Sequence, residues 1–323
     1  MRSLRILEVK SEIGAGTRGA SLGIDAMKVA ALNAGSMLFS ELPRQEVPPL
    51  NDALYASDDT PQAKHIEFVQ QMYERVCSAV AQTVESGECP LVLAGDHSTA
   101  GATIAGLRTA NPERRLGVIW IDAHADLHSP YTTPSGNMHG MPLALALGDD
   151  NLDHQRNIPA EKTVRLWEKM KQTFPGSPWI LPEDLVFIAL RDVEPEEVHL
   201  LQKYQIASYP VQRLRAHGVP TIAREILAHL RQCDLIYLSF DVDSLDCNLV
   251  SRGTGTPVPD GLTEQEAANL LKELCSSGKI ACLEIVEVNP TLDDKGNKMA
   301  ETAFRLLKQV VQVMQSEPAK IAG

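Results

Sequence analysis

The sequence predicts a single α/β domain in which a mainly parallel, eight-stranded sheet carries helices on both faces. Two observations lead to this prediction. Short apolar runs rich in β-branched residues alternate with longer segments whose apolar residues recur at helical spacing, which is typical of βα units. The chain has 323 residues, of which 44% are hydrophobic, so it can bury an extensive core. We expect residues 1–323 to form one domain.

Eight segments have the composition of buried strands, because they are short, apolar and rich in valine, isoleucine and leucine. They are residues 4–9, 36–41, 90–94, 117–122, 185–190, 206–209, 235–241 and 281–286. Continuous apolar runs of this kind are typical of parallel strands that are covered on both faces.

Seven other segments have apolar residues at intervals of three and four, the spacing that puts them on one face of a helix. They are residues 62–85, 98–108, 160–174, 195–204, 221–232, 264–276 and 298–314. Helices in these positions would cover both faces of the sheet.

Three segments are expected to lie outside this regular pattern. Residues 43–62 contain four prolines and predict an irregular surface loop. Residues 149–182 mix loop signals with one amphipathic stretch. We interpret them as an insertion near the mouth of the candidate functional site that is described below. Residues 315–323 are expected to fray.

Charge and cysteine content narrow the class of protein. A net charge of −12 argues against binding to nucleic acid or to an anionic membrane, and at most favours the approach of a cationic small molecule. The six cysteines form no CxxC pair, which indicates reduced and mostly buried thiols. No apolar stretch approaches the roughly 18 residues that span a bilayer, and the first residues lack a signal-peptide core. We therefore expect a cytoplasmic protein.

Residues 14–19, GAGTRG, match the GxGxxG pattern of dinucleotide-binding loops, and Glu41 follows at roughly the spacing of the acidic residue in such proteins. The match lies several residues beyond the predicted strand 4–9, and GxGxxG alone is a weak signal. A glycine-rich turn is the favoured interpretation, with dinucleotide binding as the alternative.

The chemistry is concentrated in three segments rich in aspartate and histidine, each of which follows a predicted strand. These are GDHS at 95–98, DAHADLH at 122–128 and SFDVDSLD at 239–246. Side chains alternate faces along a strand, so alternate residues of DAHAD and of DVD would project the same way. The six candidate metal ligands are His97, Asp122, His124, Asp126, Asp241 and Asp243.

Four carboxylates and two imidazoles are more than one tetrahedral zinc ion uses, and they suit a pair of Mn²⁺ ions, or Fe²⁺, Co²⁺ or Ni²⁺. Two such ions about 3.5–4 Å apart would lower the pKa of a shared water and supply hydroxide at neutral pH, which implies hydrolysis. A single aspartate at the end of a strand is more often a helix cap or a turn former. Three such motifs at one sheet edge favour the metal site.

These motifs resemble those of the ureohydrolase family, and the segments between them narrow the resemblance to the arginases. SPYTTPSGNMHG at 129–140 is similar to the arginase substrate loop, and LRDVEPEE at 190–197 to the segment that meets the amino-acid end of arginine. GTGTPVPDGLT at 253–263 and LEIVEVNP at 283–290 extend the similarity, which runs from about residue 14 to residue 290. The resemblance implies an arginase-like three-layer sandwich.

The resemblance also implies two manganese ions per chain with shared ligands. One ion would be bound by His97, Asp122, Asp126 and Asp241, and the other by Asp122, His124, Asp241 and Asp243. A hydroxide bridging them would attack the guanidinium carbon of L-arginine and yield L-ornithine and urea. Asp126 would accept a proton and pass it to the leaving amine, and His139 would shuttle protons between the site and solvent.

The same resemblance assigns the substrate contacts. Glu287 would hold the guanidinium, a role that suits a carboxylate facing planar N–H groups, and Thr256 would add a hydrogen bond. The contacts expected at the amino-acid end are His128, Ser135, Asn137, Asp192, Glu194 and Glu197. Each has a simpler alternative: a salt bridge for Glu287, a solvated loop histidine for His139, and a turn or helix start for the acidic segment.

Two positions depart from the arginase pattern. An asparagine is usual where this chain has His128, and an aspartate where it has Glu194. Both concern the amino-acid end of the substrate, so selectivity is in question while hydrolysis is not.

Three alternatives to an arginase remain open. The first is a ureohydrolase for another guanidino or formimino compound, such as a guanidino acid, agmatine or formiminoglutamate. The second is a zinc-dependent deacetylase of similar fold, in which His97 and Asp243 would have no comparable duty. The third is a non-catalytic relative, against which the intact ligand set argues. The resemblance further implies a homo-oligomer, either a trimer or a hexamer.

Overall fold

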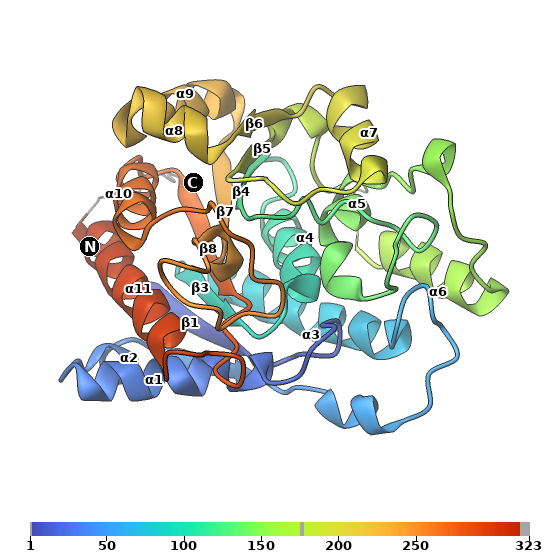
Figure 1. Ribbon diagram of the computed structural model, residues 1–323, viewed down its shortest axis with the longest axis horizontal. Coiled ribbons are helices and arrows are strands. Elements are labelled where there is room, and N and C mark those ends of the chain that lie inside the picture. Colours follow the sequence, from blue (N-terminus) through green and yellow to red (C-terminus); the bar gives the residue numbers. More distant parts are fainter. Residues whose placement is uncertain (1, 175–177, 317–323) are drawn as a thin grey trace.

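The computed structural model describes residues 2–174 and 178–316, and it is built around one sheet whose strand pairs are all parallel (Figure 1). Within the described residues the sheet has eight strands in the order β2-β1-β3-β8-β7-β4-β5-β6. Their bounds are β1 Leu4–Val9, β2 Arg44–Val47, β3 Cys89–Ala94, β4 Leu116–Ile121, β5 Leu185–Ile188, β6 Ala207–Tyr209, β7 Leu235–Asp241 and β8 Ile280–Val286. The predicted fold class is confirmed.

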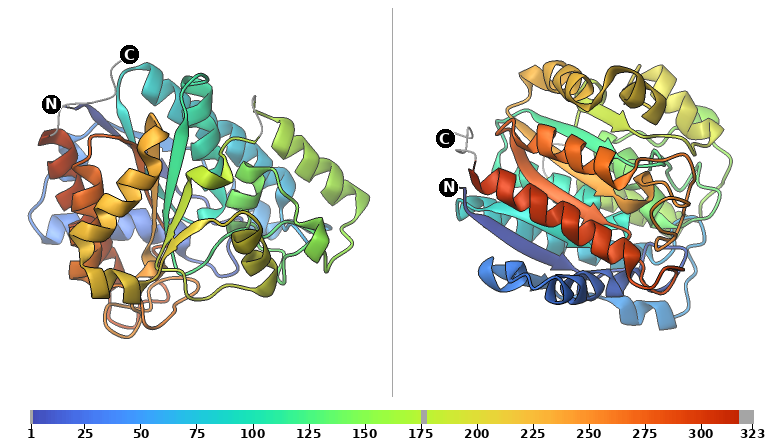
Figure 2. Two further views of the ribbon diagram at one scale, coloured as in Figure 1. Left: turned by 90° about the horizontal axis from the view of Figure 1, so that it is seen from above. Right: turned by 60° about the vertical axis from the view of Figure 1, so that its left-hand side comes forward.

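Helices cover both faces of this sheet, as the two turned views show (Figure 2). One layer contains α1 (Gly23–Asn33), α2 (Leu38–Glu41), α8 (Val211–His217), α9 (Val219–His229), α10 (Glu264–Cys275) and α11 (Lys298–Ser316). The other contains α3 (Ile66–Glu85), α4 (Ala100–Ala110), α5 (Pro142–Leu147), α6 (Glu161–Gln172) and α7 (Pro195–Lys203).

The sheet separates two hydrophobic cores, and the period of two along each strand decides which core a side chain joins. In β4, Ile119 and Ile121 pack against the layer of α9 and α10, whereas Val118 and Trp120 pack against the layer of α3 and α4. All four side chains are fully buried. Strands that are covered in this way need apolar residues at successive positions, which explains the uninterrupted apolar runs of the sequence.

The second predicted strand is wrong. Residues 36–41 were expected to be a strand, but residues 38–41 form the short helix α2 and the edge strand β2 lies at Arg44–Val47, inside the predicted loop 43–62. The three apolar residues of this segment, Met37, Leu38 and Phe39, fit either a strand or one helical turn, and length alone cannot separate the two. The strand β2 was missed because three of its four residues, Arg44, Gln45 and Glu46, are polar and face solvent at least in part.

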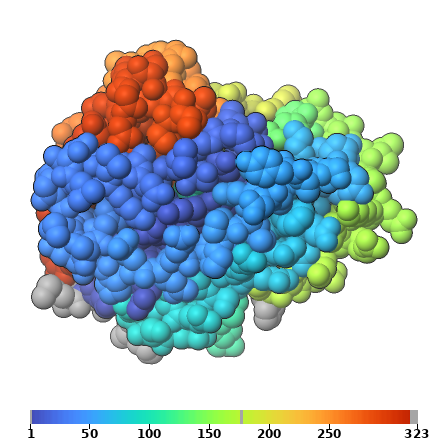
Figure 3. All heavy atoms as spheres, turned by 90° about the horizontal axis from the view of Figure 1, so that it is seen from below, coloured from blue at the N-terminus to red at the C-terminus, as the bar shows by residue number. Residues whose placement is uncertain are grey.

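The structure also contains helices that the sequence did not predict, namely α1, α5 and α8. The helix α1 follows the glycine-rich turn 14–19 and contacts α11 along the same face of the sheet. Seen from below the view of Figure 1, the surface is formed largely by the N-terminal part of the chain, coloured blue in Figure 3.

Residues 149–182 contain α6, which packs on α3 and buries Trp167, while residues 175–177 lie outside the described part. Asn157 of this segment donates a hydrogen bond to the carbonyl oxygen of Thr133 (2.7 Å), so the segment supports the loop 129–137. At the other end, α11 continues through Ser316, and the expected frayed tail 317–323 lies outside the described residues.

Two further findings concern the described residues. The six cysteines are all free and buried. The helices there include none that is both long enough and apolar enough to cross a bilayer.

Candidate metal centre

The three acidic-histidine motifs converge at the carboxyl ends of β3, β7 and β4, and β8 lies between β3 and β7 in the sheet. His97 lies in a short 3-10 turn between β3 and α4, Asp122 directly follows β4, and Asp241 is the last residue of β7. In a parallel sheet the carboxyl ends of all strands meet at one edge, which brings together residues far apart in the chain.

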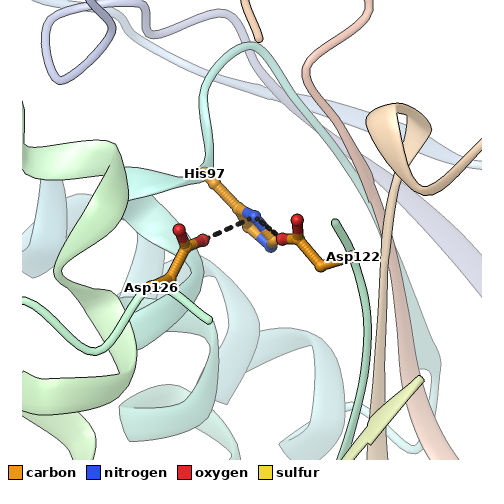
Figure 4. A group of neighbouring side chains, drawn as sticks. All are labelled: His97, Asp122 and Asp126. Atoms are coloured by element: carbon orange, nitrogen blue, oxygen red, sulfur yellow. Dashed lines mark ion pairs between the residues drawn. The ribbon is translucent and has the colours of Figure 1, made fainter. Parts of the chain in front are cut away.

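His97 is the centre of the first half of the cluster. Its Nδ1 atom lies 3.2 Å from Asp122 Oδ2, 3.1 Å from Asp126 Oδ2 and 3.2 Å from Asp241 Oδ2 (Figure 4 shows the first two). This nitrogen is buried and makes no hydrogen bond within the described part of the chain. One nitrogen cannot donate to three carboxylates at once, so the arrangement fits a cation placed among them.

His124 is the centre of the second half. Its Nδ1 atom lies 2.9 Å from Asp243 Oδ2 and 3.5 Å from Asp122 Oδ1. Asp122 therefore directs one oxygen to each imidazole, as expected of a carboxylate that bridges two ions. The oxygens of Asp241 are divided differently, because Oδ2 faces His97 while Oδ1 accepts the backbone N–H of Asp243 (2.8 Å).

The six predicted ligands thus meet, but strand alternation is not the reason. β4 ends at Ile121 and β7 at Asp241, so His124, Asp126 and Asp243 lie beyond the strands. Asp126 has a φ of +53°, a left-handed conformation that is uncommon for residues other than glycine. Local hydrogen bonds shape the turn instead: Asp122 Oδ1 accepts the backbone N–H of His124 at 2.7 Å.

Residues that the sequence did not single out hold His97 in place. Its Nε2 atom lies 2.7 Å from the hydroxyl of Ser239, and its ring stacks on Trp120 with centroids 4.1 Å apart. Trp120 also donates from Nε1 to Asp122 Oδ2 (3.0 Å). Fixing the second ring nitrogen orients Nδ1 toward the carboxylates. Ser239 and Trp120 each lie two residues before a predicted ligand, and this spacing was the signal in the sequence from which their role could have been predicted.

Asp96 of the GDHS motif was also missed. It is fully buried and accepts the backbone N–H groups of Gly14 and Ala15 on one oxygen and that of Ser98 on the other. The glycine-rich segment 14–19 is therefore a turn that packs on the site. A Cβ at Gly14 would lie 2.5 Å from the Cβ of Ser98, which explains why this position has no side chain.

A pocket opens over the cluster and joins it to the loop 129–140. It is lined by His97, His124, Asp126, His128, Thr133, Pro134, Ser135, Asn137, His139, Gly140, Asp192, Glu194, Glu197, Asp241, Asp243 and Thr256. Every expected substrate contact except Glu287 is in this lining. The side chains change from candidate metal ligands at the floor to hydroxyl, amide and carboxylate groups at the rim.

Glu287 lies behind this lining and is 2% exposed. Its Oε1 atom accepts the backbone N–H of His97 (2.9 Å) and lies 3.1 Å from His139 Nδ1. Its Oε2 atom faces Gly255, and a Cβ added at Gly255 would lie 3.7 Å from this oxygen. Burial lowers the pKa of His139, but the hydrogen bond and charge of Glu287 outweigh burial and raise that pKa to about 9.

The other expected contacts differ in how they are held. Thr256 donates from its hydroxyl to Asp243 Oδ2 (3.0 Å), and Asn137 Oδ1 accepts from Lys64 Nζ (2.9 Å). Ser135 is exposed in the loop, and Asp192 is 65% exposed. These groups surround open space instead of closing on one another.

His128, Glu194 and Glu197 form a separate group on the rim. His128 Nε2 lies 3.4 Å from Glu194 Oε2 and 3.7 Å from Glu197 Oε2. The two glutamates form the capping box at the start of α7, which explains part of the acidic segment as a helix start.

Comparisons with known proteins agree with this architecture. The model of the Arginase family matches residues 2–312. The arginase of Bacillus caldovelox is 34% identical over 311 residues, which cover 95% of this chain and 97% of that protein. Human arginase-1 is 34% identical over 270 residues, covering 82% of this chain and 76% of that protein.

A crystal structure of the arginase of Bacillus subtilis superimposes with a TM-score of 0.79 at 30% identity, covering 98% of this chain and 99% of that one. A formimidoylglutamase of Bacillus subtilis shares the fold alone, with a TM-score of 0.73 at 20% identity. The fold, the clustered ligands and these similarities together show that the chain belongs to the arginase family.

Proposed function

We propose that the protein hydrolyses the guanidinium group of L-arginine to L-ornithine and urea at a site that binds two Mn²⁺ ions. The observation that carries this proposal is the division of Asp122 between two imidazoles, with Oδ2 facing His97 and Oδ1 facing His124. Both imidazoles line a pocket whose rim presents hydroxyl, amide and carboxylate groups. The relatives named arginase supply the reaction.

The residues that would hold the ions fall into two overlapping sets. The proposed ligands of the first are His97, Asp122, Asp126 and Asp241, and of the second Asp122, His124, Asp241 and Asp243. Oxygen-rich sets with one imidazole each suit Mn²⁺, and Co²⁺, Ni²⁺ or Fe²⁺ fit the same donors. When bound, such a pair of ions lowers the pKa of a water so that a nucleophile forms at neutral pH.

The protein's own part is to orient the substrate. A guanidinium keeps its charge near neutral pH and must be held flat against the nucleophile. Glu287 is fixed by the backbone N–H of His97, and its Oε2 atom faces the space left at Gly255. We infer that Glu287 accepts N–H groups of the guanidinium there, with Thr256 nearby.

At the rim, Ser135 and Asn137 would bind the α-carboxylate of the substrate. The cation of Lys64, 2.9 Å from Asn137 Oδ1, polarises this end of the loop in favour of a negative group. Asp192, Glu194 and Glu197 would surround the α-ammonium. A substrate with both charges at one end matches this pattern.

Two side chains would handle protons. Asp126 lines the pocket while its Oδ2 atom faces His97, so its carboxylate is placed to take a proton from the attacking water and return it to the leaving amine. His139 is partly exposed and in contact with Glu287, so it can exchange protons with solvent at the pocket wall.

A second candidate is a ureohydrolase for another guanidino or formimino compound. One observation favours it: His128 lies 3.4 Å from Glu194 and 3.7 Å from Glu197, so two of the acids expected to bind an α-ammonium already face a nitrogen of the protein. A substrate without an α-amino group would leave this contact undisturbed.

Substrate comparison separates the two candidates. Purified protein loaded with Mn²⁺ is expected to release urea from L-arginine with a higher kcat/KM than from agmatine or a guanidino acid. A higher value for agmatine or for a guanidino acid, or release of formamide from formiminoglutamate in preference, would replace the first proposal with the second. Protein that binds two Mn²⁺ and hydrolyses none of these compounds would contradict both.

We also propose that the protein is cytoplasmic and forms a trimer or a hexamer. The six free, buried thiols are the state expected in a reducing compartment. Sedimentation equilibrium would test the assembly, because a monomer at micromolar concentration contradicts it.

A further inference from the structure

The group on the rim of the pocket, formed by His128, Glu194 and Glu197, has the geometry of a third cation site. One ligand atom of each residue lies within 4.8 Å of the other two. His128 follows the DAHAD motif, whereas the glutamates occupy the N-cap and the first turn of α7. The group is therefore assembled from two elements, as the binuclear cluster is.

The orientation of His128 points to a ligand. Its Nδ1 atom lies 3.2 Å from the hydroxyl of Thr132, so that nitrogen has a partner. Its Nε2 atom is buried and has no hydrogen-bond partner among the described residues, and the side chain is only 7% exposed. The two carboxylate oxygens that Nε2 faces are 3.4 Å and 3.7 Å away, beyond the usual length of an N–H···O bond of about 2.7–3.2 Å.

These separations match ligands that share an ion. Zinc binds nitrogen and oxygen at about 2.0–2.2 Å, and two such ligands at a tetrahedral angle lie roughly 3.3–3.5 Å apart. The observed 3.4 Å falls in this interval and 3.7 Å lies just above it. A metal-binding histidine usually has its other ring nitrogen fixed by a hydrogen bond, and Thr132 provides such a contact to His128.

The glutamates are held for this role. Glu197 is 2% exposed and accepts the backbone N–H of Leu127 on Oε1 (3.0 Å) and that of Glu194 on Oε2 (3.2 Å). Glu194 is 42% exposed at its side chain, which leaves a route from solvent. Two ionised carboxylates carry two negative charges, which one divalent cation would neutralise.

We propose that His128, Glu194 and Glu197 bind a third divalent cation, of the zinc class, and that this ion competes with the α-ammonium of the substrate. Three protein ligands leave a fourth position open toward the pocket. The binding site stands on its own geometry, whereas the competition rests on the proposed function. An ion held here occupies the acids that would bind the α-ammonium, so excess zinc would inhibit turnover and substrate would displace zinc.

Metal stoichiometry tests the site without reference to turnover. Protein loaded with two Mn²⁺ per chain is dialysed against Zn²⁺ at neutral pH, and both metals are counted by mass spectrometry. The expected result is one Zn²⁺ beyond the two ions of the binuclear site, lost in His128→Asn and in Glu194→Gln while those two ions remain. Glu196→Gln, on the same helix but paired with Arg156, is the matched control and should retain the third ion.

A total of two ions in the wild-type protein, or a third ion that persists in both variants, would overturn the site. If His128→Asn also loses the first two ions, the metal content of Glu194→Gln decides whether the third site exists. The side chain of Glu194 is partly exposed, so its replacement perturbs the fold less than that of His128. Excess L-ornithine should raise the zinc concentration needed for half occupancy by at least tenfold. Zinc bound independently of L-ornithine removes the competition, and failure to hydrolyse L-arginine with only the two Mn²⁺ ions bound counts against the proposed function alone.

Discussion

Replacing Asp96 with asparagine would test how the GDHS turn holds His97. Asp96 is fully buried, and its Oδ2 atom accepts the backbone N–H groups of Gly14 (2.7 Å) and Ala15 (3.1 Å). Its Oδ1 atom accepts the backbone N–H of Ser98 (2.9 Å) and the hydroxyl of the same residue (2.5 Å). Four donors therefore converge on one carboxylate, and asparagine keeps its shape but offers one oxygen.

The expected loss follows from counting these partners. In the best orientation the asparagine oxygen serves Gly14 and Ala15, and its NH₂ group faces Ser98, whose hydroxyl can turn to accept. The backbone N–H of Ser98 is then left buried and unpaired, which costs about 1–3 kcal/mol. Loss of charge assistance in the remaining bonds adds about 1 kcal/mol, and removal of a buried charge offsets part of the total. With this offset, we expect the free energy of unfolding to fall by about 1–3 kcal/mol.

Urea unfolding of the metal-free protein, followed by tryptophan fluorescence, would measure this loss. Asp58→Asn is the matched control, because Asp58 also accepts two backbone N–H groups and a hydroxyl, from Thr60 and His65, but is exposed. Water can replace those bonds, so the control should lose less than about 1 kcal/mol. Equal losses in the two variants would refute the reasoning. Affinity for Mn²⁺ should also fall in Asp96→Asn alone, since His97 is the next residue.

Three other predictions concern the proposed site and its surroundings. Asp126→Asn should nearly abolish urea release, whereas His139→Ala should keep both ions and slow release moderately; equal metal loss in the two variants would contradict these separate roles. Chelation by EDTA should lower the Tm, and Mn²⁺ should restore it, because four buried carboxylates repel one another without cations. An unchanged Tm would argue against metal binding by the cluster. Burial raises the pKa of Asp149, but Lys203 and Tyr204 outweigh burial and lower it, so its stabilisation is present above about pH 4 and is lost as the pH falls below that value. The difference in unfolding free energy between wild type and Asp149→Asn should therefore shrink as the pH falls from about 5 to about 3. A difference that grows over this range would contradict the lowered pKa of Asp149.

The outline of the fold could be predicted because parallel strands buried on both faces have a local signature. Seven of the eight strands lie within a few residues of their predicted positions. The exception, β2, is an edge strand with polar residues, and its place is decided by pairing with β1 through backbone bonds that carry no side-chain signal. The helix α2 was predicted as a strand because its apolar residues are buried in the core but are too few to show a helical period.

The sequence by itself determined the composition of the site: which carboxylates and imidazoles are present, and that each group follows a strand. Only the tertiary structure decided their geometry, because a hydrogen bond between segments distant in the chain, from the backbone N–H of Ala123 to Asp243 Oδ1, joins the turn after β4 to the turn after β7. Residue spacing also does not encode the left-handed backbone of Asp126. The same holds for the contact of His128 with Glu194 and Glu197. It is created where the loop after β4 meets the start of α7, and residue spacing alone does not encode that distance.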